Sequence, residues 1–134
     1  MCLEKARLIE EQKDITCYKI CRRRETLLDG EEYYVSLFMG YIYELGKLVT
    51  NEGRYAHVYP EEDGLLITSN AFHSFKTLKA AQNVKKKLPQ NYVIVKCTIP
   101  KESTFVYEGV CFIYGKTYVS YASQQLLPIS VVES

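Results

Sequence analysis

The chain has 134 residues, of which 47% are hydrophobic, with 17 Lys or Arg against 16 Asp or Glu. These values fit one globular domain over residues 1–134 and exclude a disordered or fibrous chain. A net charge of only +1 gives little general attraction for polyanions, so we expect neither nucleic acid nor a membrane as partner.

Targeting signals and disulfide frameworks are not expected. The apolar stretches are far shorter than the roughly 20 residues that cross a bilayer, and the N-terminal segment has no apolar signal-peptide core. An odd number of scattered cysteines is typical of reduced thiols; they are Cys2, Cys17, Cys21, Cys97 and Cys111. We therefore expect a cytoplasmic protein with five free thiols.

The N-terminal residues predict secondary structure less clearly than residues 15–21 do. Residues 3–13 are compatible with a short amphipathic helix or with an irregular arm. Residues 15–21 carry β-branched and aromatic side chains in partial alternation and predict the first strand, which ends at the arginines 22–24.

Residues 33–49 fit two patterns. Apolar side chains recur both at helical spacing and at alternate positions of an extended chain. Gly40 and the wealth of Tyr, Val and Ile disfavour a helix, so the sequence favours extended structure at 42–45 and a turn near Gly46.

The main helix is predicted at about 75–88, after a solvated loop at 51–64 and a strand at 65–68. Ser74 can cap this helix and Pro89 can end it. An apolar stripe at every third or fourth position predicts the buried face; it comprises Phe75, Leu78, Ala81, Val84 and Leu88.

Short strands dominate the remainder. Alternation predicts strands at 92–99, 104–107, 110–114, 118–122 and 126–132, with a turn at 100–103 and Pro128 tolerated at an edge or end. Because these strands follow one another through short turns, we expect an α+β fold with a mostly antiparallel or mixed sheet. It contains one main helix (75–88) and, if residues 3–13 are helical, a short N-terminal one.

The sequence offers no catalytic set. Glycine-rich phosphate loops and His-Glu-x-x-His are absent, so neither a catalytic residue nor a cofactor is predicted. Cys17 and Cys21 on one strand would lie about 13 Å apart, too far to share a metal. His73, just before the predicted helix, is the candidate ligand contact, although a structural role is the alternative.

Tyrosine is the other notable residue type, with twelve copies and no tryptophan. Tyr34, Tyr41 and Tyr43 belong to a crowded stretch whose rings either cover the sheet or form a recognition surface. The basic runs 22–24 and 85–87 are typical of solvated surface, and we expect the tyrosines to contribute more to any partner surface.

Several short motifs carry a family resemblance along nearly the whole chain. They are Met-Cys-Leu at the start, Asp-Ile-Thr-Cys-Tyr-Lys at 14–19, Tyr-x-Tyr-x-x-Gly-Lys at 41–47, Phe-His-Ser-Phe at 72–75, Val-Lys-Cys-Thr-Ile-Pro-Lys at 95–101 and Tyr-Ala-Ser at 121–123. The chain resembles small proteins of unknown activity from gut Bacteroides-type bacteria and their phages. It departs from them at Ala71 and Glu102, where they usually carry Gly. The resemblance implies no catalytic residues.

A second likeness is to the fold of ADP-ribosyltransferase-like domains, which bind a nicotinamide dinucleotide in a cleft. That likeness implies Tyr18, Lys19 and His73 as cleft residues. Two functional hypotheses follow. One is a non-enzymatic interaction module of bacterial or phage origin that binds a protein partner; the alternative is an ADP-ribosyltransferase-like enzyme or nucleotide-binding domain, intact or degenerate.

Overall fold

The computed structural model describes residues 2–26, 29–37, 40–51, 57–68 and 71–132, and these form a mostly antiparallel sheet with one short helix. The predicted mostly antiparallel sheet with one main helix is confirmed, and the fold is largely β rather than a balanced α+β fold. The strands are β1 (Cys2–Leu8), β2 (Ile15–Glu25), β3 (Glu32–Ser36), β4 (Ile42–Tyr43), β5 (Val49–Thr50), β6 (His57–Glu61), β7 (Gly64–Thr68), β8 (Phe72–Phe75), β9 (Tyr92–Ile99), β10 (Val106–Ile113), β11 (Lys116–Ser123) and β12 (Gln125–Val132), and the helix is α1 (Leu78–Lys85).

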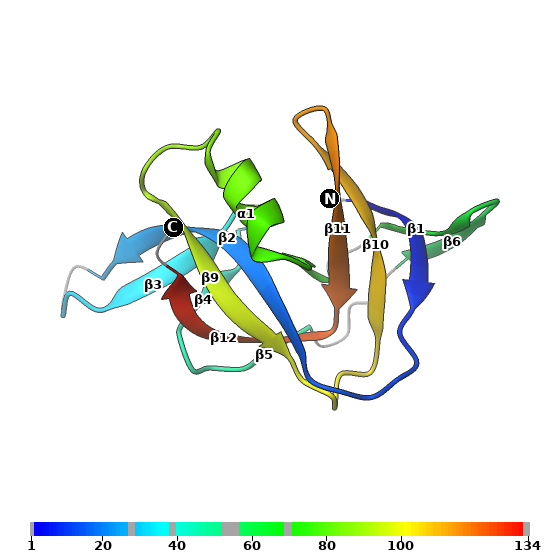
Figure 1. Ribbon diagram of the computed structural model, residues 1–134. Coiled ribbons are helices and arrows are strands. Elements are labelled where there is room, and N and C mark those ends of the chain that lie inside the picture. The colour runs from blue at the N-terminus through cyan, green and yellow to red at the C-terminus, as the bar shows by residue number, and fades with distance from the viewer. Residues whose placement is uncertain (1, 27–28, 38–39, 52–56, 69–70, 133–134) are drawn as a thin grey trace.

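The sheet forks at β2, its longest strand. One edge of β2 pairs with β9, whereas the other pairs with β3 through Cys21–Glu25 and with β8 where Tyr18 faces Phe75. The fork separates a β2 half, in the order β4-β3-β2-β9-β12-β5, from a β10 half, in the order β8-β11-β10-β1-β7-β6. Figure 1 shows the two halves on opposite sides of the molecule.

The core consists of three clusters, and two of them join the halves. One contains Cys17, Cys21 and Tyr43 of the β2 half together with Phe72 of β8, and a second, covered by α1, contains Ile20 and Ile94 together with Cys111 of β10. Leu3, Ala6 and Ile67 belong to a third, which lies within the β10 half. Cys17 and Cys21 share one cluster because alternate residues of a strand point to the same face.

The predicted helix exists but is shorter than 75–88. Thr77, not Ser74, is its N-cap, and its hydroxyl accepts a hydrogen bond from the Ala80 amide at 3.1 Å. Phe75 belongs instead to β8, where pairing with Ser120 and Tyr18 replaces the first helical turn. An eight-residue helix has little stability of its own, so burial of Ala81 and Val84 against the sheet holds it.

The helix considered for residues 3–13 is wrong, because β1 occupies the interior of the β10 half between β7 and β10. Its buried residues Leu3 and Ala6 are three apart, a spacing that suggests a helix. A β-bulge between them, with Lys5 at φ 50°, lets both side chains reach the same core.

Other predictions are mixed. The extended structure favoured at 42–45 is confirmed in part by β4, the turn near Gly46 is present with Gly46 at φ 82°, and the strand at 92–99 is confirmed; residues 38–39 lie outside the described residues. The loop predicted over 51–64 is wrong in part because β6 lies within it, and residues 52–56 lie outside the described residues. The strands predicted at 104–107 and 110–114 are one strand, β10. Pro128 lies inside β12 beside a bulge.

Candidate functional site

A groove lies where the two ends of the β2 half approach each other. It has a volume of about 430 Å³ and is bordered by β4 on one side and β5 on the other. Its lining comprises Tyr41, Ile42, Tyr43, Leu48, Val49, Thr50, Asn51 and Phe72. Below, this set is called the seam groove.

The floor of the seam groove is aromatic and its rim is aliphatic. Phe72 lies between two tyrosines, with ring centroids 4.9 Å from Tyr41 and 6.2 Å from Tyr43. Phe72 and Tyr43 are buried, whereas Ile42 at the rim is 62% exposed and Leu48 is 50% exposed. Large apolar side chains that remain this exposed beside an apolar floor are typical of a recognition surface.

Local hydrogen bonds fix both borders. Ser36 and Tyr41 bond twice across the β3–β4 turn: the Ser36 amide donates to the Tyr41 carbonyl at 2.8 Å, and the Tyr41 amide donates to the Ser36 hydroxyl at 2.9 Å. On the β5 side, the amide of Gly46 donates to the Pro128 carbonyl at 2.8 Å. The positive φ at this position is accessible to glycine without strain.

A buried lysine lies behind the groove. Lys19 of β2 is buried, with its ammonium 5.6 Å from the centre of the Tyr43 ring, and donates a hydrogen bond to the backbone carbonyl of His73. Burial holds the pKa of Lys19 below its ordinary value. Burial likewise raises the pKa of Tyr43 well above its usual range and that of Cys21 to about 12.

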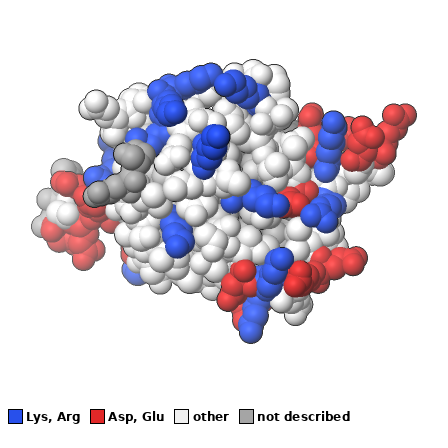
Figure 2. All heavy atoms as spheres, viewed as in Figure 1, with Lys and Arg blue, Asp and Glu red and all other residues white. Residues whose placement is uncertain are grey.

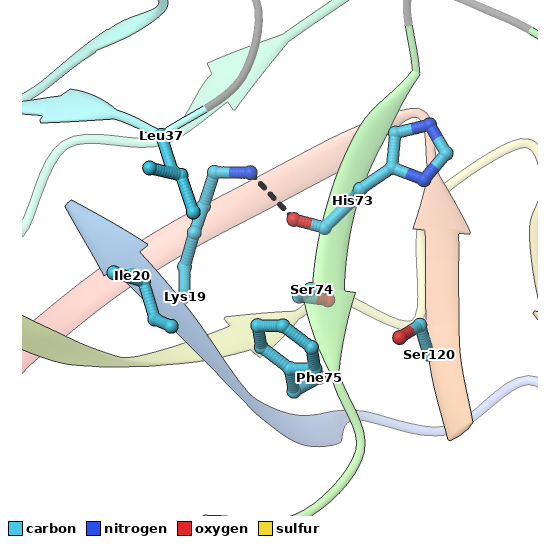
Figure 3. Close-up of a pocket in the computed structure, with 7 residues that line it drawn as sticks. All are labelled: Lys19, Ile20, Leu37, His73, Ser74, Phe75 and Ser120. Atoms are coloured by element: carbon cyan, nitrogen blue, oxygen red, sulfur yellow. Dashed lines mark hydrogen bonds between the residues drawn. The ribbon is translucent and has the colours of Figure 1, made fainter. Parts of the chain in front are cut away.

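Lys19 also lines a small cavity at the fork of the sheet, together with Ile20, Leu37, His73, Ser74, Phe75 and Ser120 (Figure 3). The cavity holds about 20 Å³, room for roughly one water molecule. Figure 3 shows that His73 contributes its carbonyl, while its imidazole points away. A ligand of nucleotide size would require β2 and β8 to separate.

The structure brings together some of the residues that the sequence singled out. Lys19 and His73 meet at the fork, and His73 lies in β8 rather than before the helix. Tyr41 and Tyr43 line the seam groove. Tyr34 is buried in β3 opposite Tyr43, and its hydroxyl donates to Glu32 at 2.9 Å.

Tyr18 alternates with Lys19 along β2 and packs, half-buried, against the cluster under α1. Sequence analysis missed Leu48, Val49 and Phe72 in the groove. Phe72 reaches it only through the long-range pairing of β8, which leaves no local signal. The apolar residues at 42, 45 and 48, which the structure leaves exposed, were the available sign of the groove in the sequence.

No family model, curated protein or solved structure matches the chain. Within the described residues, no helix has the length and apolar character required to span a membrane. In the same part of the chain, no group of three or more His, Cys, Asp or Glu side chains is arranged to hold a metal ion.

Proposed function

We propose that the chain is an interaction module that binds an extended peptide with apolar side chains in the seam groove. The origin of the module in bacteria or their phages rests on the sequence motifs alone. The observation that supports the function best is the pairing of β4 and β5. Within the described residues, β4 pairs only with β3 and β5 pairs only with β12, yet both border one apolar groove.

An extended peptide matches this arrangement because a strand edge offers unpaired backbone donors and acceptors. Main-chain hydrogen bonds to β4 or β5 would supply affinity, and alternate side chains of the peptide would enter the groove. Its aromatic floor is held by packing of Phe72 against Tyr41 and Tyr43. A preorganised floor reduces the entropy lost on binding.

The test begins with a displayed library of random peptides about ten residues long, the upper end of ordinary strand length. Selected peptides are measured by isothermal titration calorimetry. Replacing Leu48 with Asp places a charge at the groove rim and should weaken binding by about 2 kcal/mol or more, a loss of roughly 30-fold. Leu8→Asp is the matched control, since Leu8 in β1 is 46% exposed against 50% for Leu48.

Backbone recognition has its own readout. Bound peptide should slow hydrogen exchange at amides of β4 or β5. Methylating every second backbone nitrogen of the peptide should abolish binding when those nitrogens face the strand, and methylating the other set should leave binding unchanged. Binding that survives Leu48→Asp, or that leaves exchange in both strands unchanged, would reject the proposal. A second copy of the chain in the groove would instead appear as concentration-dependent dimerisation.

A nucleotide is the second candidate ligand, supported by the meeting of Lys19 with the His73 segment at the fork. An ammonium there would attract a phosphate if the halves opened. Saturable binding of nicotinamide dinucleotide should raise the melting temperature, and Lys19→Met should remove that increase. No shift at millimolar ligand would dismiss this candidate.

A further inference from the structure

Charge is divided unevenly along the chain although the total is balanced. Residues 64–134 contain eight lysines and only three acidic residues, Glu102, Glu108 and Glu133, whereas residues 1–63 contain 13 acidic and nine basic residues. The second part therefore has a net charge of +5 and the first of −4. Asymmetry of this kind is a recognised feature of chains that contact nucleic acid.

The fold concentrates part of this charge at one end. The C-terminal turn of α1 meets the tip of the β10–β11 hairpin, where the Lys87 ammonium lies 5.4 Å from the centre of the Tyr114 ring. Lys86 is exposed in the same turn and Lys116 at the hairpin tip. In Figure 2, basic side chains gather along the top of the visible face, above α1 and the hairpin, and acidic ones gather at the sides and bottom.

Two exposed aromatic rings belong to the same hairpin. Tyr114 at the tip, beside Lys87, is 53% exposed, and Phe112 is 68% exposed on the face of β10 opposite to Ile113, which packs under α1. Flat rings among cations are the combination that binds unpaired bases, since the rings stack with bases and the lysines contact phosphates. We call Lys86, Lys87, Lys116, Phe112 and Tyr114 the lysine end.

We propose that the lysine end binds single-stranded nucleic acid. An acidic protein would use the lysines but has no general need for exposed rings, and a duplex hides the faces of its bases. Lys76 is not part of the lysine end, and Glu108 pairs with it at 2.7 Å. The proposal involves neither Lys76 nor the seam groove, so it stands or falls independently of peptide binding.

The experiment measures fluorescence anisotropy of a labelled oligothymidine of about 12 nucleotides at several salt concentrations. We expect affinity to fall as salt rises, by a slope of about 0.7 in the logarithms for each phosphate contacted. The double substitution Lys86→Glu with Lys87→Glu should weaken binding at least about tenfold at low salt and reduce the slope.

A matched pair, Lys13→Glu with Lys101→Glu, changes net charge equally but lies outside the lysine end, and should have a much smaller effect. Replacing Phe112 or Tyr114 with Ala should weaken binding and leave the salt slope nearly unchanged, because stacking releases no counterions. Thermal melts establish that each variant is folded.

Four results would overturn the proposal. They are no binding at about 50 mM salt, equal loss in the two lysine pairs, insensitivity to both ring substitutions, and equal affinity for a duplex. Polyglutamate or anionic vesicles that bind more tightly than the oligonucleotide would assign the lysine end to an acidic protein or a membrane instead.

Discussion

Gly109 offers a direct test of the N-terminal strand. A Cβ atom at this position would lie 2.6 Å from the carbonyl oxygen of Glu4 and 2.9 Å from the Cα atom of Ala6. Both are backbone atoms of β1, so a change of side-chain rotamer cannot relieve the clash. Gly109→Ala must therefore displace β1, which pairs with β7 as well as β10.

Overpacking typically costs about 1–3 kcal/mol, and we expect the upper end here because two strand pairings are disturbed. That is a large share of a total stability of about 5–15 kcal/mol. Urea unfolding followed by circular dichroism measures the loss. The control is Gly115→Ala, where φ is 79° but the space is open, and only the backbone penalty of about 1 kcal/mol applies. If Gly109→Ala lowers the free energy of unfolding by less than about 0.5 kcal/mol, the placement of β1 beside β10 is contradicted.

Three further predictions concern the core. Since burial lowers the pKa of Lys19, the stability of the wild type relative to Lys19→Met in urea unfolding should rise as the pH approaches about 10.4, where lysine titrates in the unfolded chain. Cys21 and Tyr43, whose raised pKa values oppose this rise, are common to both chains, so a difference in stability that does not change with pH would contradict the prediction. Val84→Ala should cost about 2 kcal/mol, and Leu78→Ala less, because Val84 is fully buried and Leu78 half-buried; the reverse order would contradict the placement of α1. Cys21, whose pKa burial raises to about 12, should resist a thiol reagent until the chain unfolds, and rapid native labelling would count against its burial.

Local pattern predicted the strands whose burial alternates regularly. In β9, the buried residues Val95, Cys97 and Ile99 point to one face, so the expected strand at 92–99 has the right bounds. The helix stripe was also found because Ala81 and Val84 are buried together. Its predicted start was too early because Phe75 continues the apolar stripe while its backbone pairs in β8.

Long-range pairing accounts for what the sequence could not predict. The spacing of Leu3 and Ala6 indicates a helix unless a bulge is known, and the bulge exists because β1 must match two neighbours at once. The seam groove likewise depends on long-range pairing, because Phe72 lies in β8, which pairs with β2 at the fork. Tyr41 and Tyr43 were accessible to sequence reasoning because their aromatic enrichment is local.

The uneven distribution of charge shows why a balanced composition is a weak guide to local electrostatic potential. A net charge of +1 is the sum of an acidic first part and a basic second part, whereas electrostatic attraction depends on the potential within about a Debye length, about 8 Å at physiological salt. The two proposed surfaces are nevertheless connected, since β8 begins with Phe72 at the groove floor and leads directly into α1. If peptide binding displaces Phe72, the displacement is transmitted toward α1, and peptide and oligonucleotide should alter each other's affinity by the same factor. If Phe72 stays in place, the two ligands should bind additively. Titrating one ligand in the presence of saturating amounts of the other therefore distinguishes a coupled pair of sites from two independent ones.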